Sequence, residues 1–136
     1  MRYDDAQRCH LIPIGMMRQC GSVIENASDC VEVHVTVSSR GEAARICSAV
    51  VEERLAAAAQ IVAPIESVYW WAGEIQRSDE WLVLMKTTVG RFEQLARRVR
   101  ELHSYEVPQI VAVALVAGTT DYLEWIRRET SLDSGE

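Results

Sequence analysis

The order in which strand-like and helix-like periods follow one another limits the fold of this chain more than any other feature. Apolar and polar side chains alternate along residues 31–37, VEVHVTV, and a period of two is typical of a strand. Residues 38–59 then place apolar side chains on one side of a helix, and Ser39 and Glu42 have the spacing of a capping box at its start. The sequence therefore predicts a strand followed by an amphipathic helix.

Two long stretches after this helix predict a hairpin. Residues 60–75 are rich in valine, isoleucine and aromatic side chains, and residues 79–88 return after the polar turn QRS at 76–78. Pro64 has no N–H to give to a neighbouring strand, so the first hairpin strand must lie at a sheet edge or contain a bulge.

The second half of the chain predicts a helix, a strand and a last helix. Apolar side chains recur in steps of three and four along residues 90–103, which is the spacing of a helix. Residues 108–118 are almost continuously apolar and suit one strand in the middle of a covered sheet. Thr119 is a plausible N-cap for a helix over residues 119–130.

We therefore predict an α+β fold of the ferredoxin-like type, a split βαβ sandwich. It has an antiparallel four-stranded sheet, a long hairpin between its second and third strands, and an extra C-terminal helix. Right-handed crossovers place both main helices on one face of the sheet. The apolar face that remains open predicts that further copies of the chain supply the missing layer.

Residues 31–131 form the one domain that this pattern predicts. No period persists through residues 1–30, so we expect a loosely ordered N-terminal extension there, and a flexible tail at 132–136. A chain of 136 residues can bury a core without disulfides or a structural metal. Its four cysteines contain no CxxC pair, so a disulfide framework is not expected.

Charge and hydropathy limit the partners and the location. A net charge of -6 argues against nucleic-acid binding, which depends on lysine and arginine. No apolar run reaches the length of a membrane span, and the apolar stretch near the N-terminus lacks a small-residue cleavage site. We therefore expect a cytoplasmic protein with no nucleic-acid and no membrane partner.

Three of the four tryptophans fall within the predicted hairpin. Consecutive strand residues face opposite sides, so Trp70 and Trp71 cannot both enter one core. Tyr69 lies on the side of Trp71, and Trp81 comes from the returning strand. A two-stranded ribbon that exposes such side chains is marginal in water. We predict that these four residues lie at the interface between subunits.

Four segments, in this order along the chain, resemble the CutA family, the divalent-cation tolerance proteins: EERLAAAAQIVAPIESVYWWAGEI, VLMKTT, LHSYEVPQIVAVAL and GTTDYLEWI. The resemblance spans about residues 31–130. It implies a ferredoxin-like subunit in a homotrimer, similar in build to the PII signal-transduction proteins, with long hairpins that pair between subunits. It also implies a role in the response to metal ions, and it raises the prospect of a protein partner.

The resemblance implies copper ligands at three positions, a cysteine in the first strand and two consecutive histidines at the end of the second helix. In this chain those positions hold Val35, Leu102 and His103. Valine and leucine cannot coordinate copper, so His103 is the one candidate metal ligand that remains. We expect no required cofactor and at most weak binding of a divalent metal such as copper, with Glu106, or Glu66 from another subunit, as a further donor.

A second interpretation is a PII-like regulatory or interaction module. It would bind a small ligand or a protein partner at the clefts between subunits, and the candidate residues there are Glu66, Lys86, Tyr105 and Glu106. The sequence contains no glycine-rich phosphate loop, no GxSxG and no HExxH motif. We therefore do not expect an enzyme.

Overall fold

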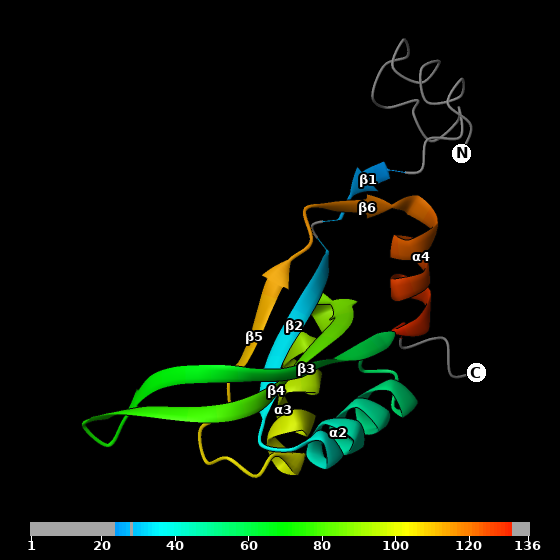
Figure 1. The fold of residues 1–136 in the computed structure, drawn as a ribbon. Helices are drawn as coiled ribbons and strands as arrows, with labels where there is room; N and C mark the ends of the chain where they lie inside the picture. Colours follow the sequence, from blue (N-terminus) through cyan, green and yellow to red (C-terminus); the bar gives the residue numbers. More distant parts are fainter. Residues whose placement is uncertain (1–23, 28, 132–136) are drawn as a thin grey trace.

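The computed structural model describes residues 24–27 and 29–131. Its elements follow the predicted order, with two short strands added (Figure 1). Their bounds are β1 Ile24–Asn26, β2 Cys30–Val37, α2 Arg40–Glu52, β3 Ala58–Trp71, β4 Glu74–Thr88, the 3-10 turn η2 Val89–Arg91, α3 Phe92–Leu102, β5 Ile110–Ala114, β6 Ala117–Thr119 and α4 Thr120–Glu129.

The large sheet has the strand order β3-β4-β2-β5, and each neighbouring pair is antiparallel. The first strand of the split unit, β2, thus lies between the last strand, β5, and the second hairpin strand, β4. This is the ferredoxin-like arrangement, so the predicted fold class is confirmed. The hairpin of β3 and β4 extends sideways beyond the other strands (Figure 1).

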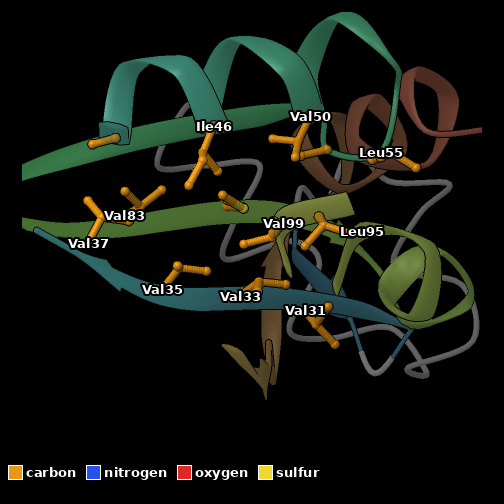
Figure 2. Close-up of a cluster of buried hydrophobic side chains, with 13 residues drawn as sticks. Val31, Val33, Val35, Val37, Ile46, Val50, Leu55, Val83, Leu95 and Val99 are labelled. Atoms are coloured by element: carbon orange, nitrogen blue, oxygen red, sulfur yellow. The ribbon is translucent and has the colours of Figure 1, made fainter. Parts of the chain in front are cut away.

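The main core lies between one face of this sheet and the helices α2 and α3. Alternate residues of β2 point toward the helices, as Figure 2 shows for Val33 and Val35. Ile46 and Val50 from α2 and Val99 from α3 meet them, and all five side chains are fully buried. The period of two in β2 and the helical period in α2 and α3 therefore converge on a single core, as the sequence predicts.

The opposite face of the sheet is covered by no helix of residues 24–27 and 29–131. Its centre is more polar than the sequence led us to expect. Lys86 Nζ lies 2.8 Å from Glu32 Oε1 and donates to Gln60 Oε1 at 3.0 Å, and His34 Nε2 lies 2.7 Å from Glu32 Oε2. Apolar side chains remain toward the sheet edge, where Val111 and Val113 of β5 are exposed. This face therefore offers ion pairs at its centre, which suit an interface that retains water, and apolar side chains at its edge, which suit one that excludes it.

The hairpin turn is displaced from its predicted place. It lies at Ala72 and Gly73, whose φ angles are +52° and +79°, while residues 76–78 belong to β4. Two positive φ angles are those of the type I′ turn that fits the twist of a hairpin. The expectations for Pro64 are confirmed in both forms, because β3 is an edge strand and its register with β4 shifts between Val62 and Ile65.

The apolar run at 108–118 forms two strands, so the prediction of a single strand was wrong. β5 ends at Ala114, and Leu115 then donates its N–H to the carbonyl of Cys30 at 3.0 Å and packs against a second, smaller cluster. β6 pairs with β1 in a separate two-stranded sheet. The chain therefore leaves the large sheet at Leu115, because this side chain packs in the second cluster.

Residues 24–27 include a paired strand, although the sequence placed them in a loosely ordered extension. Arg127 of α4 attaches this segment: it donates to both oxygens of Asp29, at 2.7 and 2.8 Å, and to Glu25 at 2.7 Å. These hydrogen bonds, first those with Asp29, raise the pKa of Arg127 further above its ordinary value, so the side chain stays charged. The remainder of the predicted extension, residues 1–23, and the predicted tail, 132–136, lie outside the described residues.

Candidate functional site

A groove of about 880 Å³ lies between the protruding hairpin and the loop that follows α3. Both borders are visible in Figure 1, with the loop below the hairpin arm. The groove has the volume of a small-molecule site. Its lining comes from β2, the hairpin and the loop: Thr36, Ser67, Val68, Tyr69, Trp70, Trp71, Glu80 and residues 104–109.

A carboxylate and a phenol form the polar centre of this groove. Glu80 of β4 is 6% exposed, and Tyr105 Oη donates to its Oε2 at 2.9 Å. Burial raises the pKa of Tyr105, and the hydrogen bond to Glu80 raises it further. Tyr105 therefore remains a neutral donor at physiological pH, and one face of the Glu80 carboxylate is occupied by it.

Aromatic side chains form the outer wall. Trp70 is 71% exposed and Trp71 51% exposed, and Tyr69 Oη lies 3.0 Å from Ser78 Oγ. Trp81 differs from these residues because it packs against the main core of its own chain. Of the four aromatic residues predicted to lie at a subunit interface, Tyr69, Trp70 and Trp71 are thus exposed on the hairpin. Trp81 is partly buried against the core of its own chain.

His103, the candidate metal ligand, holds the loop in place. Its side chain is fully buried. Nε2 donates to the carbonyl of Thr36 at 2.8 Å, since a carbonyl can only accept, and Nδ1 accepts from the N–H of Tyr105 at 3.0 Å. The ring also contacts that of Tyr105, with centroids 4.8 Å apart. Both nitrogens are occupied, so in this conformation the ring offers no lone pair to a metal ion.

The other two positions of the family's copper pattern are equally unsuited to a metal. Val35 is fully buried in the main core, and Leu102 packs against the same core. Among residues 24–27 and 29–131, no three His, Cys, Asp or Glu side chains come together in a way that could hold a metal ion. The donor set of a copper site is therefore not present at these three positions.

Glu42 supports the groove from behind. It is 2% exposed and accepts hydrogen bonds from the N–H and Oγ of Ser38, at 3.2 and 2.9 Å, and from the N–H and Oγ of Ser104, at 2.7 and 3.1 Å. Burial would raise the pKa of Glu42, but these bonds outweigh it and lower the pKa. One carboxylate thereby joins the start of α2 to the loop that lines the groove.

Sequence reasoning found only half of this role. The predicted capping box is present in one direction, since the N–H of Glu42 donates to Ser39 Oγ at 3.1 Å. The carboxylate itself binds Ser38 and Ser104. Ser104 is 62 residues away in the chain, and no local pattern could indicate that contact.

The four residues predicted to line a cleft separate into two groups. Tyr105 and Glu106 line the groove. Glu66 lies on the hairpin beside Arg77, with Oε1 and Nη1 3.6 Å apart, and Lys86 lies on the open sheet face with Glu32. The hydrogen bond from Lys86 is the first cause that lowers the pKa of Glu32, so this pair is charged.

The bulge at Pro64 explains the separation. Before it, even-numbered residues of β3 pair with even-numbered residues of β4, as Gln60 does with Leu84; after it, odd-numbered residues take their place, as Ile65 does with Glu80. A shift of one residue exchanges the two faces of a strand. Glu66 is thereby turned away from the face that carries Lys86 and Glu80.

Helices long and apolar enough to cross a bilayer do not occur in the part of the chain that the structure describes.

The chain is similar to known proteins over most of its length. The family model described as CutA1 divalent ion tolerance protein matches residues 31–129. The divalent-cation tolerance protein CutA of Thermus thermophilus is 46% identical over 98 residues, which cover 72% of this chain and 95% of that protein.

Solved structures agree. The structure of CutA from Synechococcus elongatus has a TM-score of 0.75 at 32% identity, covering 79% of this chain and 96% of that one. The periplasmic divalent cation tolerance protein CutA of Archaeoglobus fulgidus has a TM-score of 0.73 at 32% identity, covering 75% and 99%.

Proposed function

Because this chain belongs to the CutA1 divalent ion tolerance family, we propose that it acts in divalent-cation tolerance as a homotrimer that binds divalent metal ions weakly, through oxygen atoms. The observation that carries the proposal is the exposed, aromatic hairpin at one edge of the large sheet, together with β5 at the other edge, whose outer side pairs with no strand of the described residues. The proposal includes no catalysed reaction and no required cofactor.

The two sheet edges favour a ring. β3 forms one edge and β5 the other, so a contact between them joins two different surfaces. Such head-to-tail contacts produce closed rings when the rotation closes. Exposed apolar side chains lie at both edges: Trp70 and Ile75 on the hairpin and Val113 on β5. Their exposure contributes no stability to a monomer. Pairing β3 with the β5 strand of the next copy would cover them and complete a groove at each boundary.

The mass of the purified protein tests the assembly. Light scattering in dilute buffer should give about three times the chain mass of 15.3 kDa. A mass near that of one chain would contradict the trimer and, with it, the proposed clefts between subunits.

Weak metal binding is supported by paired carboxylates on the hairpin. Glu66 and Asp79 are opposite each other in the register of β3 and β4, at a spacing where cross-strand side chains interact. Two oxygen donors hold a divalent ion only loosely. We propose them as donors in place of the absent family ligands.

Calorimetric titration with Cu(II) and Zn(II) measures this binding directly. We expect a dissociation constant of about 0.1 mM or weaker, unchanged in His103→Gln, since both ring nitrogens of His103 are already bonded within the chain. Glu66→Gln should weaken it further. Micromolar copper binding that disappears in a correctly folded His103→Gln protein would show instead that His103 is a ligand.

The second candidate function, a regulatory or interaction module that binds a small ligand or a protein, is favoured by the groove itself. Tyr105 and Glu106 line it, and its volume suits a small molecule.

The cytoplasmic location stays a prediction from the sequence, because the Archaeoglobus relative is named as periplasmic. Cell fractionation of the native organism would decide between the two compartments.

A further inference from the structure

We propose that the outer face of α2 is a self-complementary surface through which two copies of the protein pair. In this contact α2 of one copy lies antiparallel to α2 of the other, across a two-fold axis. The inference goes beyond the proposed function, because it involves neither the hairpin nor a metal donor. Three properties of the helix support it: the place of this face in the fold, the order of its charges, and the absence of partners for them within the described chain.

The face lies on the helical side of the molecule. α2 turns Ile46 and Val50 into the main core, as Figure 2 shows, and four other residues face away from that core. We call these residues the α2 face: Arg45, Ser48, Ala49 and Glu52. They line a shallow depression of about 460 Å³ beside Arg98 of α3. The proposed ring instead uses the hairpin, the edge of β5 and the open face of the sheet.

The order of the residues makes the α2 face complementary to itself. Positions 45, 48, 49 and 52 are three, four and seven residues apart, which places them on one side of a helix. The midpoint between Ser48 and Ala49 is also the midpoint between Arg45 and Glu52. A two-fold contact pairs each residue with its counterpart twice. In an antiparallel pair of α2 helices, Arg45 therefore lies opposite Glu52 on both sides of the axis.

The two charges have no partner within one copy. Arg45 and Glu52 form no ion pair and no side-chain hydrogen bond within residues 24–27 and 29–131. They lie about 10 Å apart along the helix axis, too far for a direct pair. Their neighbours Glu53 and Arg98 are paired, with Oε1 and Nε 3.1 Å apart. A second copy would thus supply the counter-charges that the first copy lacks.

The centre of the α2 face permits a close approach. Ser48 and Ala49 are small, and helix axes that pack together lie about 8 to 10 Å apart. The depression contains two arginines and two glutamates, so copies that each carry a net charge of -6 meet no net charge there. Exposed ion pairs each contribute little, so pairing should appear only at about 0.1 mM protein and above. Measurements on dilute samples are therefore unaffected.

Sedimentation equilibrium of the full chain measures the pairing. At one fixed ionic strength, the average mass should approach twice its dilute value as the protein concentration rises toward about 1 mM. Arg45→Glu gives each copy two acidic groups on the α2 face, and Glu52→Arg gives each copy two basic groups. Because the two-fold axis repeats each contact, one substitution replaces two attractions with two repulsions. Each variant alone should raise the dissociation constant of pairing at least tenfold.

A mixture of the two variants provides the sharpest test. The acidic face of Arg45→Glu is complementary to the basic face of Glu52→Arg, so the mixture should pair although neither variant does so alone. The protein that carries both substitutions should again pair with itself. General effects of net charge cannot produce this pattern, and a variant that pairs in the mixture must be folded.

Two substitutions outside the depression serve as charge controls. Arg100→Glu on α3 and Glu124→Arg on α4 change the net charge by the same amounts at exposed positions, and they should leave the dissociation constant close to that of the wild type.

Three results would overturn the inference: a wild-type mass that stays at its dilute value to about 1 mM, a mixture that does not pair, or controls that weaken pairing as much as Arg45→Glu does. The first of these is also the result expected if the α2 face binds only a different protein. The dilute mass decides the proposed trimer separately, because the pairing is measured as a doubling of that mass.

Discussion

Replacing Glu42 with alanine should lower the free energy of unfolding by about 3 kcal/mol, because it removes the acceptor of four hydrogen bonds at a buried position. Glu42 is 2% exposed, and its partners are the N–H and Oγ groups of Ser38 and Ser104. Without the carboxylate, the start of α2 and the loop after α3 lose the buried acceptor that joins them. Urea unfolding at a fixed protein concentration measures the loss.

Glu52 gives the matched control for this substitution. It lies in the last turn of the same helix, α2, and is exposed. Glu52→Ala should change the free energy of unfolding by less than about 0.5 kcal/mol. Equal effects of the two substitutions would mean that the contacts of Glu42 with Ser104 contribute nothing to stability.

The effect of Glu42 should depend on pH in a defined direction. Burial raises the pKa of this carboxyl, the bonds from Ser104 and Ser38 outweigh that effect, and the folded pKa lies below the ordinary value of 4.5. A group with a lowered folded pKa contributes stability that is present above the unfolded pKa and lost as pH falls through the folded one. The difference between wild type and Glu42→Ala should therefore shrink below pH 4.5. A constant difference from pH 3 to pH 7 would contradict this account.

The fold was predictable from the sequence because its main signals are local. The period of two along residues 31–37 and the helical period of α2 and α3 each depend on neighbours a few positions away. The break at Leu115 was not predictable, since that side chain leaves the sheet for a cluster built with Cys30 and α4. The turn was misplaced because residues 76–78 are polar for another reason: they lie in a ribbon that projects into solvent.

The candidate site was predictable only in part. Tyr105 and Glu106 lie in a loop whose neighbours resemble a known family, and that resemblance identified them. Glu80 was missed because, between Asp79 and Trp81, it has the pattern of an ordinary polar strand residue. It becomes buried through a contact with Tyr105, 25 residues further along the chain. Contacts of that kind leave no mark in local periodicity.

The double substitution Trp70→Ser and Trp71→Ser should convert the proposed trimer into single chains at micromolar concentration. Both side chains are more than half exposed in the isolated chain, and assembly is the event that would bury them. Complete burial of a large apolar side chain contributes about 1.5 to 3 kcal/mol. A ring repeats each contact at every boundary, and aromatic anchors carry much of the energy of such interfaces. Light scattering should then give a mass near 15.3 kDa.

Two controls separate loss of assembly from loss of folding. Val89→Ser removes an apolar side chain that is 61% exposed on η2, away from the hairpin, and should leave the mass unchanged. Trp81→Phe alters a tryptophan that packs on its own core, so it should lower the melting temperature while the trimer persists. The double variant should keep the circular dichroism of a folded protein. Its melting temperature should no longer rise with protein concentration, because assembly no longer stabilises the folded chain. A double variant that retains the mass of three chains would show that the hairpin tryptophans do not hold the subunits together.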